Sequence, residues 1–234
     1  MLELHVAETG SDTAAGTHRD PVATVARAVE RSREAGDTGP HRILIHPGTY
    51  FDTEVTLTGR DSGLAIEAAS GPVRLVGGRA ITGWRTEADG CCSAPLPEVR
   101  TGAWDFRMLA VNGAWRPRAR LPEAGFFECR NDFNVRWLST TAGGWERAPT
   151  EEELSVLLFR PEDLGPWLDT RNAEITVYHS WDESLCGVAD LDAAAGRLRF
   201  SSPAGHPPGA FGNRKYVVHN IREGLTADGQ WFLD

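Results

Sequence analysis

After residue 40, apolar and polar positions alternate with a period of two. The apolar members recur as the pairs Ile43/Ile45, Val55/Leu57, Leu64/Ile66 and Val73/Leu75. Alternation of this kind is typical of β-strands that bury one face, and no helical pattern separates one pair from the next. The first and third pairs lie 21 residues apart and the second and fourth 18 apart. This spacing fits the two stacked strand series of a solenoid and fits a β-meander equally well.

Before residue 40 the pattern predicts one strand and one helix. Residues 2–6 alternate as a strand, and a polar loop follows them. Helical spacing then places four apolar residues on one face: Val22, Val25, Ala26 and Val29. Asp20 is the predicted helix cap, Pro21 suits a first helical position, and Gly36 marks the end.

Beyond residue 84 the rhythm changes to a turn-rich segment with further strand-like runs at 106–111, 173–181 and 197–201. Asn112-Gly113 is a strong hairpin signal because both residues tolerate positive φ. Thr150 and Glu153 have the spacing of a capping box and predict a short helical stretch over 150–158. These elements predict a small antiparallel β-sandwich.

The amino-acid composition limits the kinds of binding partner that we expect for this protein. The 25 Gly and 14 Pro fit a turn-rich β protein, and the formal net charge of −9 disfavours a polyphosphate ligand. The short cluster Arg116, Arg118 and Arg120 is more simply one solvated strand face. We therefore expect no nucleic-acid partner. No basic, apolar leader and no membrane-length apolar run is present, which predicts a cytoplasmic protein with no membrane partner.

Metal and cofactor signatures are also missing from the sequence. The four cysteines, at 91, 92, 129 and 186, contain no Cys-x-x-Cys pair, and the seven histidines show no ligand spacing. Phosphate-loop, dinucleotide and Gly-x-Ser-x-Gly signatures are absent. We expect no metal and no cofactor.

Several strings resemble one family. HVAETGSDTAAGTHRDPVATVARAV, ILIHPGTY and LTGRDSGLAIEAASGPVRLVGGRAITGW resemble the capping helix and first coils of right-handed parallel β-helix proteins of the pectate-lyase-like group. MLAVNGAWRPRARLP, VYHSWDESLCGVADLDAAAGRLRF and NRKYVVHNIREGLTADGQWFLD resemble an inserted domain and the return to the helix in glycoside hydrolases of that group. Gln230 stands where these relatives usually have an acid, and Phe232 where they have Tyr.

The resemblance implies a mainly β fold: the start of a right-handed parallel β-helix with an N-terminal capping helix and an inserted antiparallel β-sandwich-like domain. The corresponding ranges are 1–84 for the capping helix and first coils, 85–212 for the insertion and 213–234 for the return. It implies a protein that acts on a polysaccharide or oligosaccharide. The family's carboxylates lie in coils that this sequence lacks, so no catalytic residue is assigned and the chain alone is expected to be inactive.

Local chemistry suggests four substrate-binding residues: His179, Trp181, Asn220 and Glu223. His179 and Trp181 are expected on one face of a strand, where they offer hydrogen bonding and stacking to a sugar ring, although such a pair more often fills a core. Asp182 and Glu183 are neighbours that do not face one another in a strand, so a solvated turn is favoured over a glycosidase carboxyl pair.

Three functions remain open from the sequence. The chain is the N-terminal part of a glycoside-hydrolase-like protein, or a complete non-catalytic module for glycan binding or assembly, or a small enzyme with two facing carboxylates. The module predicts an exposed aromatic platform near Trp104, Trp115 or Trp181. A homo-oligomer, the sugar and linkage, hydrolase or lyase chemistry, and calcium binding are all left open.

Overall fold

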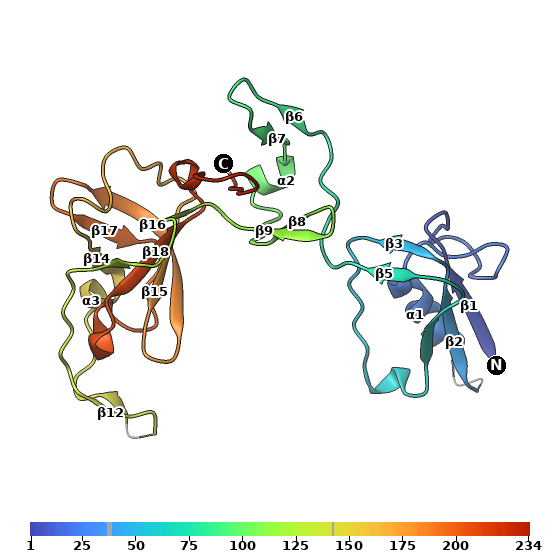
Figure 1. The fold of residues 1–234 in the computed structure, drawn as a ribbon. Coiled ribbons are helices and arrows are strands. Elements are labelled where there is room, and N and C mark those ends of the chain that lie inside the picture. The colour runs from blue at the N-terminus through green and yellow to red at the C-terminus, as the bar shows by residue number, and fades with distance from the viewer. Residues whose placement is uncertain (37–38, 142) are drawn as a thin grey trace. The chain divides into compact units, whose positions relative to one another are not determined.

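A computed structural model describes residues 1–36, 39–141 and 143–234 of the chain. These residues form two compact units, residues 1–100 and residues 101–234 (Figure 1). Both units consist mainly of strands and turns, with few helical residues. The prediction of a mainly β protein is therefore confirmed.

The first unit contains two parallel sheets. The three-stranded sheet has the order β1 (Leu2–Val6), β2 (His41–Ile45) and β4 (Ala65–Ala68), and the two-stranded sheet pairs β3 (Gly48–Tyr50) with β5 (Val73–Leu75). Ile43 lies opposite Ile66, and Gly48 opposite Val73. The corner at Pro47-Gly48 thus takes the chain from a strand of one sheet directly into a strand of the other.

The predicted strand at Val55 and Leu57 is wrong. The strand after the corner is β3, which supplies the backbone groups that pair with β5. Val55 is only partly buried, and the Leu57 side chain is 54% exposed. Because β3 already occupies the parallel position beside β5, residues 55–57 have no ladder to join and do not stack beneath Val73 and Leu75.

Helix α1 (Val25–Glu34) packs on the parallel sheet and shares its apolar core. Val25 and Val29 of the helix and Val6, Ile43 and Ile45 of the strands belong to one buried cluster. The predicted cap at Asp20 is wrong, because the Asp20 carboxylate accepts a hydrogen bond from the Ala15 backbone instead. Thr24 caps the helix by accepting a hydrogen bond from the Arg27 backbone amide at 3.1 Å.

Short elements complete the first unit. They are η1 (Gly59–Asp61), the antiparallel pair β6 (Arg85–Thr86) and β7 (Cys92–Ser93), and α2 (Pro97–Arg100). Arg33 near the end of α1 donates hydrogen bonds to both carboxylate oxygens of Asp61, each at 2.7 Å. This bidentate pair attaches η1 to α1.

The second unit is built on one antiparallel sheet. Its strands run in the order β10 (Arg120–Leu121), β18 (Lys215–His219), β15 (Glu174–Tyr178), β16 (Glu183–Asp192), β17 (Arg197–Phe200) and β14 (Val156–Leu158), and β11 (Phe127–Glu128) also pairs with β18. Side chains from both halves of the sheet share one core, which includes Leu157, Ile175, Leu198 and Tyr216. The long strand β16 joins the halves and has a register shift between Val188 and Asp190, an irregularity of the β-bulge kind.

Further short elements surround this sheet. They are the hairpin β8 (Leu109–Val111) and β9 (Ala114–Arg116), the hairpin β12 (Trp137–Ser139) and β13 (Gly144–Trp145), α3 (Glu151–Ser155), η2 (Ala210–Gly212) and η3 (Arg222–Gly224). The Asn112-Gly113 turn between β8 and β9 has φ of 53° and 77°, as its sequence predicts. The Thr150 capping box is present at α3. The helix ends at Ser155 rather than at 158, because Val156 already pairs with Arg199 in the sheet.

Residues 213–234 belong to the second unit. Their strand β18 lies between β10 and β15 in the antiparallel sheet. Residues 85–100 belong to the first unit. The division of the chain into a β-helix and an insertion at residues 84 and 212 stays a prediction.

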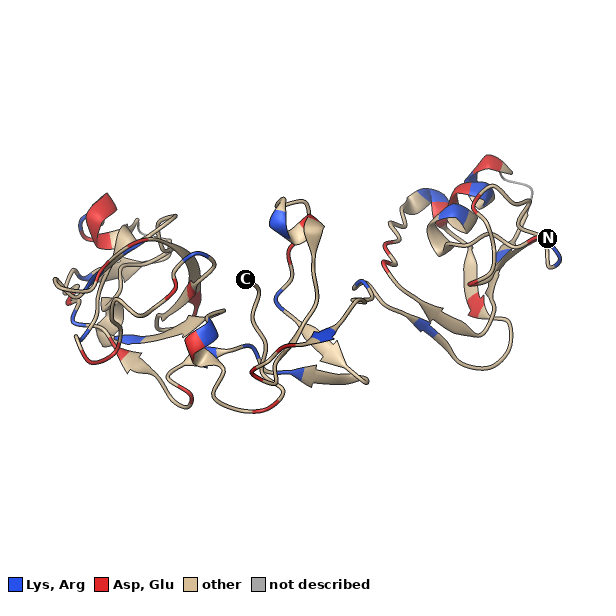
Figure 2. Cartoon of the chain, turned by 90° about the horizontal axis from the view of Figure 1, so that it is seen from above, with Lys and Arg blue, Asp and Glu red and all other residues tan. Residues whose placement is uncertain are grey.

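Charged residues of both signs are interspersed along the chain (Figure 2). Helix α1 alternates arginines with glutamates, whereas α3 begins with three glutamates, one of which pairs with Arg197 and Arg199. Among the described residues, no helix is long and apolar enough to cross a membrane.

Candidate functional site

The four predicted substrate-binding residues lie at the two ends of strand β15. Glu174 at its start lies opposite His219, so Asn220 and Glu223 follow β18 at that end of the sheet. His179 and Trp181 follow Tyr178 at the other end. Five residues of strand separate the two ends by about 15 Å. The structure therefore brings together His179 with Trp181, and Asn220 with Glu223, but does not join the two pairs.

His179 and Trp181 lie in the turn between β15 and β16. The His179 backbone amide donates to the Asp182 carbonyl at 2.9 Å and closes the turn. The prediction of a strand through residue 181 is wrong for this reason, and the two side chains do not share a strand face. His179 is 4% exposed, whereas Trp181 is 60% exposed.

Trp181 is part of a cluster that we call the aromatic patch: Trp137, Trp145, Trp181, His206 and Phe211. Phe211 lies at the centre, with ring centroids 4.6 Å from Trp181 and 4.7 Å from Trp145. Trp137 lies 4.8 Å from Trp145 and 5.7 Å from Trp181. Most of these rings meet at steep angles, an arrangement that aromatic pairs favour.

Three separate segments build the patch. Trp137 and Trp145 are cross-strand partners in the hairpin β12–β13. Phe211 belongs to η2, where its φ is 58°, and His206 precedes η2 in the same connection. The buried ring of Phe133 meets Trp145 edge-on at 5.0 Å and supports the hairpin from below. Trp181, the most exposed ring of the patch, therefore packs against other aromatic side chains that hold it in place.

Two histidines lie near Trp181: the His206 ring is 5.9 Å from the Trp181 ring, and His179 lies two residues before Trp181 in the turn. His179 Nε2 is 2.9 Å from Ser184 Oγ, and the two imidazole rings of His179 and His206 are 5.3 Å apart. His206 Nε2 lies 3.7 Å from an Asp182 carboxylate oxygen. Burial lowers the pKa of His179, Asp182 opposes that shift, and His206 adds to it. His179 is therefore a neutral imidazole at neutral pH.

Sequence reasoning identified His179 and Trp181 but missed Trp137, Trp145, His206 and Phe211. Two tryptophans flanking a Gly-Gly turn are a recognisable hairpin signal. Nothing local predicts that this hairpin packs against Trp181, about forty positions later, or against His206 and Phe211, which lie still further along the chain.

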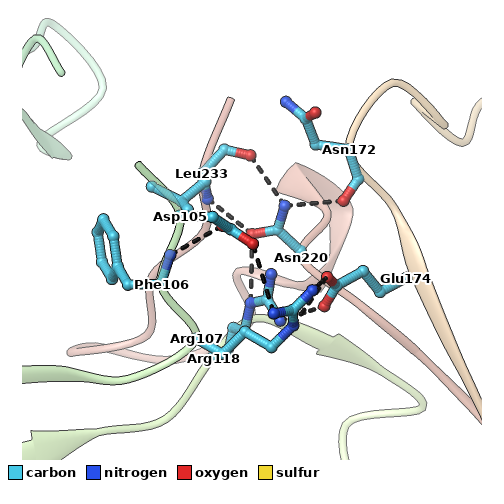
Figure 3. Close-up of polar contacts among 8 residues, drawn as sticks. All are labelled: Asp105, Phe106, Arg107, Arg118, Asn172, Glu174, Asn220 and Leu233. Atoms are coloured by element: carbon cyan, nitrogen blue, oxygen red, sulfur yellow. Dashed lines mark hydrogen bonds and ion pairs between the residues drawn. The ribbon is translucent and has the colours of Figure 1, made fainter. Parts of the chain in front are cut away.

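Asn220 lies in a polar network at the other end of the sheet (Figure 3). Its side-chain amide donates to the carbonyls of Asn172 and Leu233 at 2.8 and 3.0 Å, and its carbonyl oxygen accepts from the Leu233 amide at 2.7 Å. Arg118 Nε also donates to this oxygen at 3.3 Å. Asn220 is 4% exposed and its polar atoms are committed to the protein. These contacts indicate a structural role for Asn220: its side chain acts as a clamp that holds the chain segment at Leu233.

Glu174 neutralises two arginines beside this clamp. Arg107 donates to Glu174 at 2.8 Å, and Arg118 makes a further short ion pair with the other carboxylate oxygen (Figure 3). Glu223 lies in η3 with one carboxylate oxygen buried and without a hydrogen-bond partner among the described residues. Because Glu174 is bound to two guanidinium groups, it is not a free carboxyl that could act as a partner to Glu223.

Other aromatic candidates differ from the aromatic patch. Trp104 stacks on Phe106 at 4.6 Å, and Phe106 stacks on the buried Trp231 at 5.3 Å. Trp115 projects from the β9 strand and is 68% exposed. Trp104 thus has supporting rings but is only partly exposed, whereas Trp181 is both supported by rings and 60% exposed.

A cavity lies in each unit. One, of about 150 Å³, lies by Asn220 and includes Asp169, Arg171 and Asp234, where Arg171 already pairs with both acids. It is smaller than the usual range for small-molecule pockets. The other, of about 340 Å³, lies in the first unit between the start of α1 and residues 49–54. Within the part of the chain that the structure describes, no three His, Cys, Asp or Glu side chains are arranged to hold a metal ion.

Comparisons with known proteins support the fold. No protein-family profile matches the chain, and no curated protein matches it in sequence. A solved structure named "Glycoside hydrolase" aligns over 100% of this chain and 42% of its own length, with a TM-score of 0.68 and 22% identity. A second, named "The complex structure of XylC with xylose", aligns over 100% of this chain and 33% of its own at 19% identity, but its TM-score of 0.25 supports no argument. The chain therefore has the fold of part of a protein named as a glycoside hydrolase, and spans less than half of that protein's length.

Proposed function

We propose that this chain is the N-terminal part of a β-helix glycoside-hydrolase-like protein that acts on a polysaccharide or oligosaccharide, with the catalytic coils missing from this chain. The fold shared over the whole chain with a structure named "Glycoside hydrolase" supports this proposal. The two parallel sheets of the first unit support the β-helix, because each coil of such a helix adds one strand to each sheet. By this proposal, the acid and its partner carboxylate belong to the missing coils.

The aromatic patch is the proposed saccharide-binding surface, and the exposure of Trp181 carries this part of the proposal. Sugar rings present apolar C–H faces that pack on flat aromatic surfaces, and their hydroxyl groups need nearby hydrogen-bonding groups. An exposed tryptophan held rigidly by other rings meets the first need at little cost in side-chain entropy. The polar groups of the 179–182 turn lie beside this tryptophan and can form hydrogen bonds with the sugar hydroxyl groups.

A complete non-catalytic module for glycan binding or assembly is the second candidate. Its support is that residues 101–234 form a compact unit with its own core and carry the whole aromatic patch. Both candidates predict saccharide binding without catalysis by this chain. A form of the protein that continues with further strand-turn coils separates them, because only the first candidate expects glycosidase activity in that form.

Affinity electrophoresis of the purified chain in gels containing xylan, arabinan, galactan or β-glucan tests the binding proposal. We expect retardation by at least one polysaccharide and about tenfold weaker binding for Trp181→Ala, equivalent to about 1.4 kcal/mol. Trp167→Ala is the matched control, because Trp167 is 51% exposed in the same unit and makes no ring contact with the patch. Equal retardation of Trp181→Ala and the unmodified protein would exclude the aromatic patch as the binding surface.

Hydrolysis assays with aryl glycosides and the same polysaccharides test the catalytic part. We expect no release of aryl alcohol or reducing ends by this chain alone. Turnover that survives repurification and disappears on substitution of Glu223 would overturn the proposal that the catalytic carboxyls lie elsewhere.

A further inference from the structure

His179 holds the turn that carries Trp181. Its carbonyl accepts a hydrogen bond from the Asn213 side chain at 2.6 Å, and its Nε2 lies 2.9 Å from Ser184 Oγ. Ser184 Oγ also accepts from the Gly205 amide at 2.9 Å. His179 therefore ties the turn to strand β16 and to the 205–213 connection, which supplies the other rings beside Trp181.

This environment accommodates only the neutral imidazole. The Nδ1 atom of His179 is buried and has no hydrogen-bond partner among the described residues. In the charged imidazolium both ring nitrogens carry protons, so Nδ1 is then a buried N–H donor without an acceptor among the described residues, which costs free energy. The charged or titratable groups that act on the ring are Asp182, which favours the imidazolium, and His206, which opposes it.

The direction of the pH effect follows from this burial. Because folding lowers the pKa of His179, its contribution to stability is complete above the unfolded value of about 6.5 and is lost as the pH falls below it. Asp182 is the acidic group that acts on His179, and its carboxylate already lies 3.7 Å from His206 Nε2. Acidification therefore adds positive charge to the turn, and the surrounding groups do not neutralise that charge.

We propose that His179 is a positioning residue that holds Trp181 in the aromatic patch only while its imidazole is neutral, so that acidification releases Trp181 and any bound saccharide. This inference rests on the proposed saccharide-binding function for its consequence, but not for the movement of Trp181. The movement is a property of the turn, the two histidines and Asp182.

Fluorine NMR of the chain labelled with 5-fluorotryptophan tests the movement directly. The sequence has eight tryptophans, so the spectrum contains few signals, and Trp181→Ala identifies the signal of Trp181. Between pH 7.5 and 5 we expect this signal to shift or broaden while that of the exposed Trp115 stays in place. His179→Gln, which keeps a polar side chain but takes up no proton, should abolish the response. His18→Gln, a change at an exposed histidine of the first unit, should retain it.

An unmoved Trp181 signal in the unmodified protein over this range would overturn the proposal, and this titration needs no variant to fold. A response of the same midpoint in His179→Gln would also overturn it, because another group would then be responsible. Affinity electrophoresis at pH 7.5 and 5 distinguishes the movement of Trp181 from the release of saccharide. Loss of retardation at pH 5 supports the release of saccharide. A pH-dependent Trp181 signal with no retardation at either pH supports the positioning role of His179 and overturns the proposed binding function.

Discussion

Replacement of Asn220 by alanine should destabilise the second unit strongly, because Asn220 combines a demanding backbone conformation with buried hydrogen bonds. Its φ is 59°, in the left-handed region that asparagine tolerates better than alanine. Its side chain makes hydrogen bonds to Asn172, Leu233 and Arg118. At about 1 kcal/mol for each of the well-formed bonds and about 1 kcal/mol for the backbone, the expected loss is about 3–5 kcal/mol.

Asn220→Gly separates these two contributions. Glycine loses the same hydrogen bonds but adopts positive φ without strain, so it should be about 1 kcal/mol more stable than Asn220→Ala. Asn134→Ala is the matched control, because Asn134 is exposed, and it should change stability by less than about 0.5 kcal/mol.

Urea unfolding followed by tryptophan fluorescence measures these differences. Residues 101–234 contain seven of the eight tryptophans, so the signal reports mainly on the second unit. A loss below about 1 kcal/mol for Asn220→Ala, or equal stability of the Ala and Gly variants, would refute the clamp. A stable Asn220→Ala protein that no longer binds saccharide would instead support the substrate-binding role that the sequence suggests.

Three further predictions concern stability. Phe159→Ala should cost about 3–5 kcal/mol in the same urea assay, because Phe159 is fully buried in the core of the second unit, whereas Phe126→Ala at a half-exposed position of the same unit should cost far less. Thr24→Ala should lower the melting temperature of the first unit by removing the helix cap, at about 1 kcal/mol, and Asp20→Ala should leave the helix cap intact; equal helical loss in circular dichroism for both would contradict this assignment. Burial, with Arg120 and Arg118 adding to it, lowers the pKa of His219 to about 4, so the stability that neutral His219 contributes is present above pH 6.5 and is lost as the pH falls toward 4. His219→Gln should therefore reduce the difference in urea midpoint between pH 7 and 4.5, whereas His18→Gln should preserve it.

The elements that the sequence predicted well are those whose signals are local. Asn112-Gly113 makes its hairpin because both residues accept positive φ, and the Thr150 capping box satisfies helix amides within one turn. Strand boundaries were predicted less well. Whether Val156 continues a helix or enters a sheet depends on Arg199 as a pairing partner, which lies far away in the sequence.

The candidate site shows the same division. The sequence identifies His179 and Trp181 as side chains suited to sugar recognition, but it gives no reason to place them with Trp137, Trp145 and Phe211. It also groups them with Asn220 and Glu223, and the antiparallel register of β15 and β18 places those residues at the opposite end of the sheet.

The sequence by itself determined a mainly β chain with one amphipathic helix, its tight turns and the side chains available for chemistry, because periodicity, caps and turn residues act over a few neighbouring positions. The tertiary structure decided that β3, and not residues 55–57, pairs with β5, and that four aromatic rings from three segments meet around Phe211. It also decided that Asn220 holds Leu233. Such outcomes depend on which distant strand or ring occupies a given space. Close packing in the folded chain decides this, because only one group can fill each position.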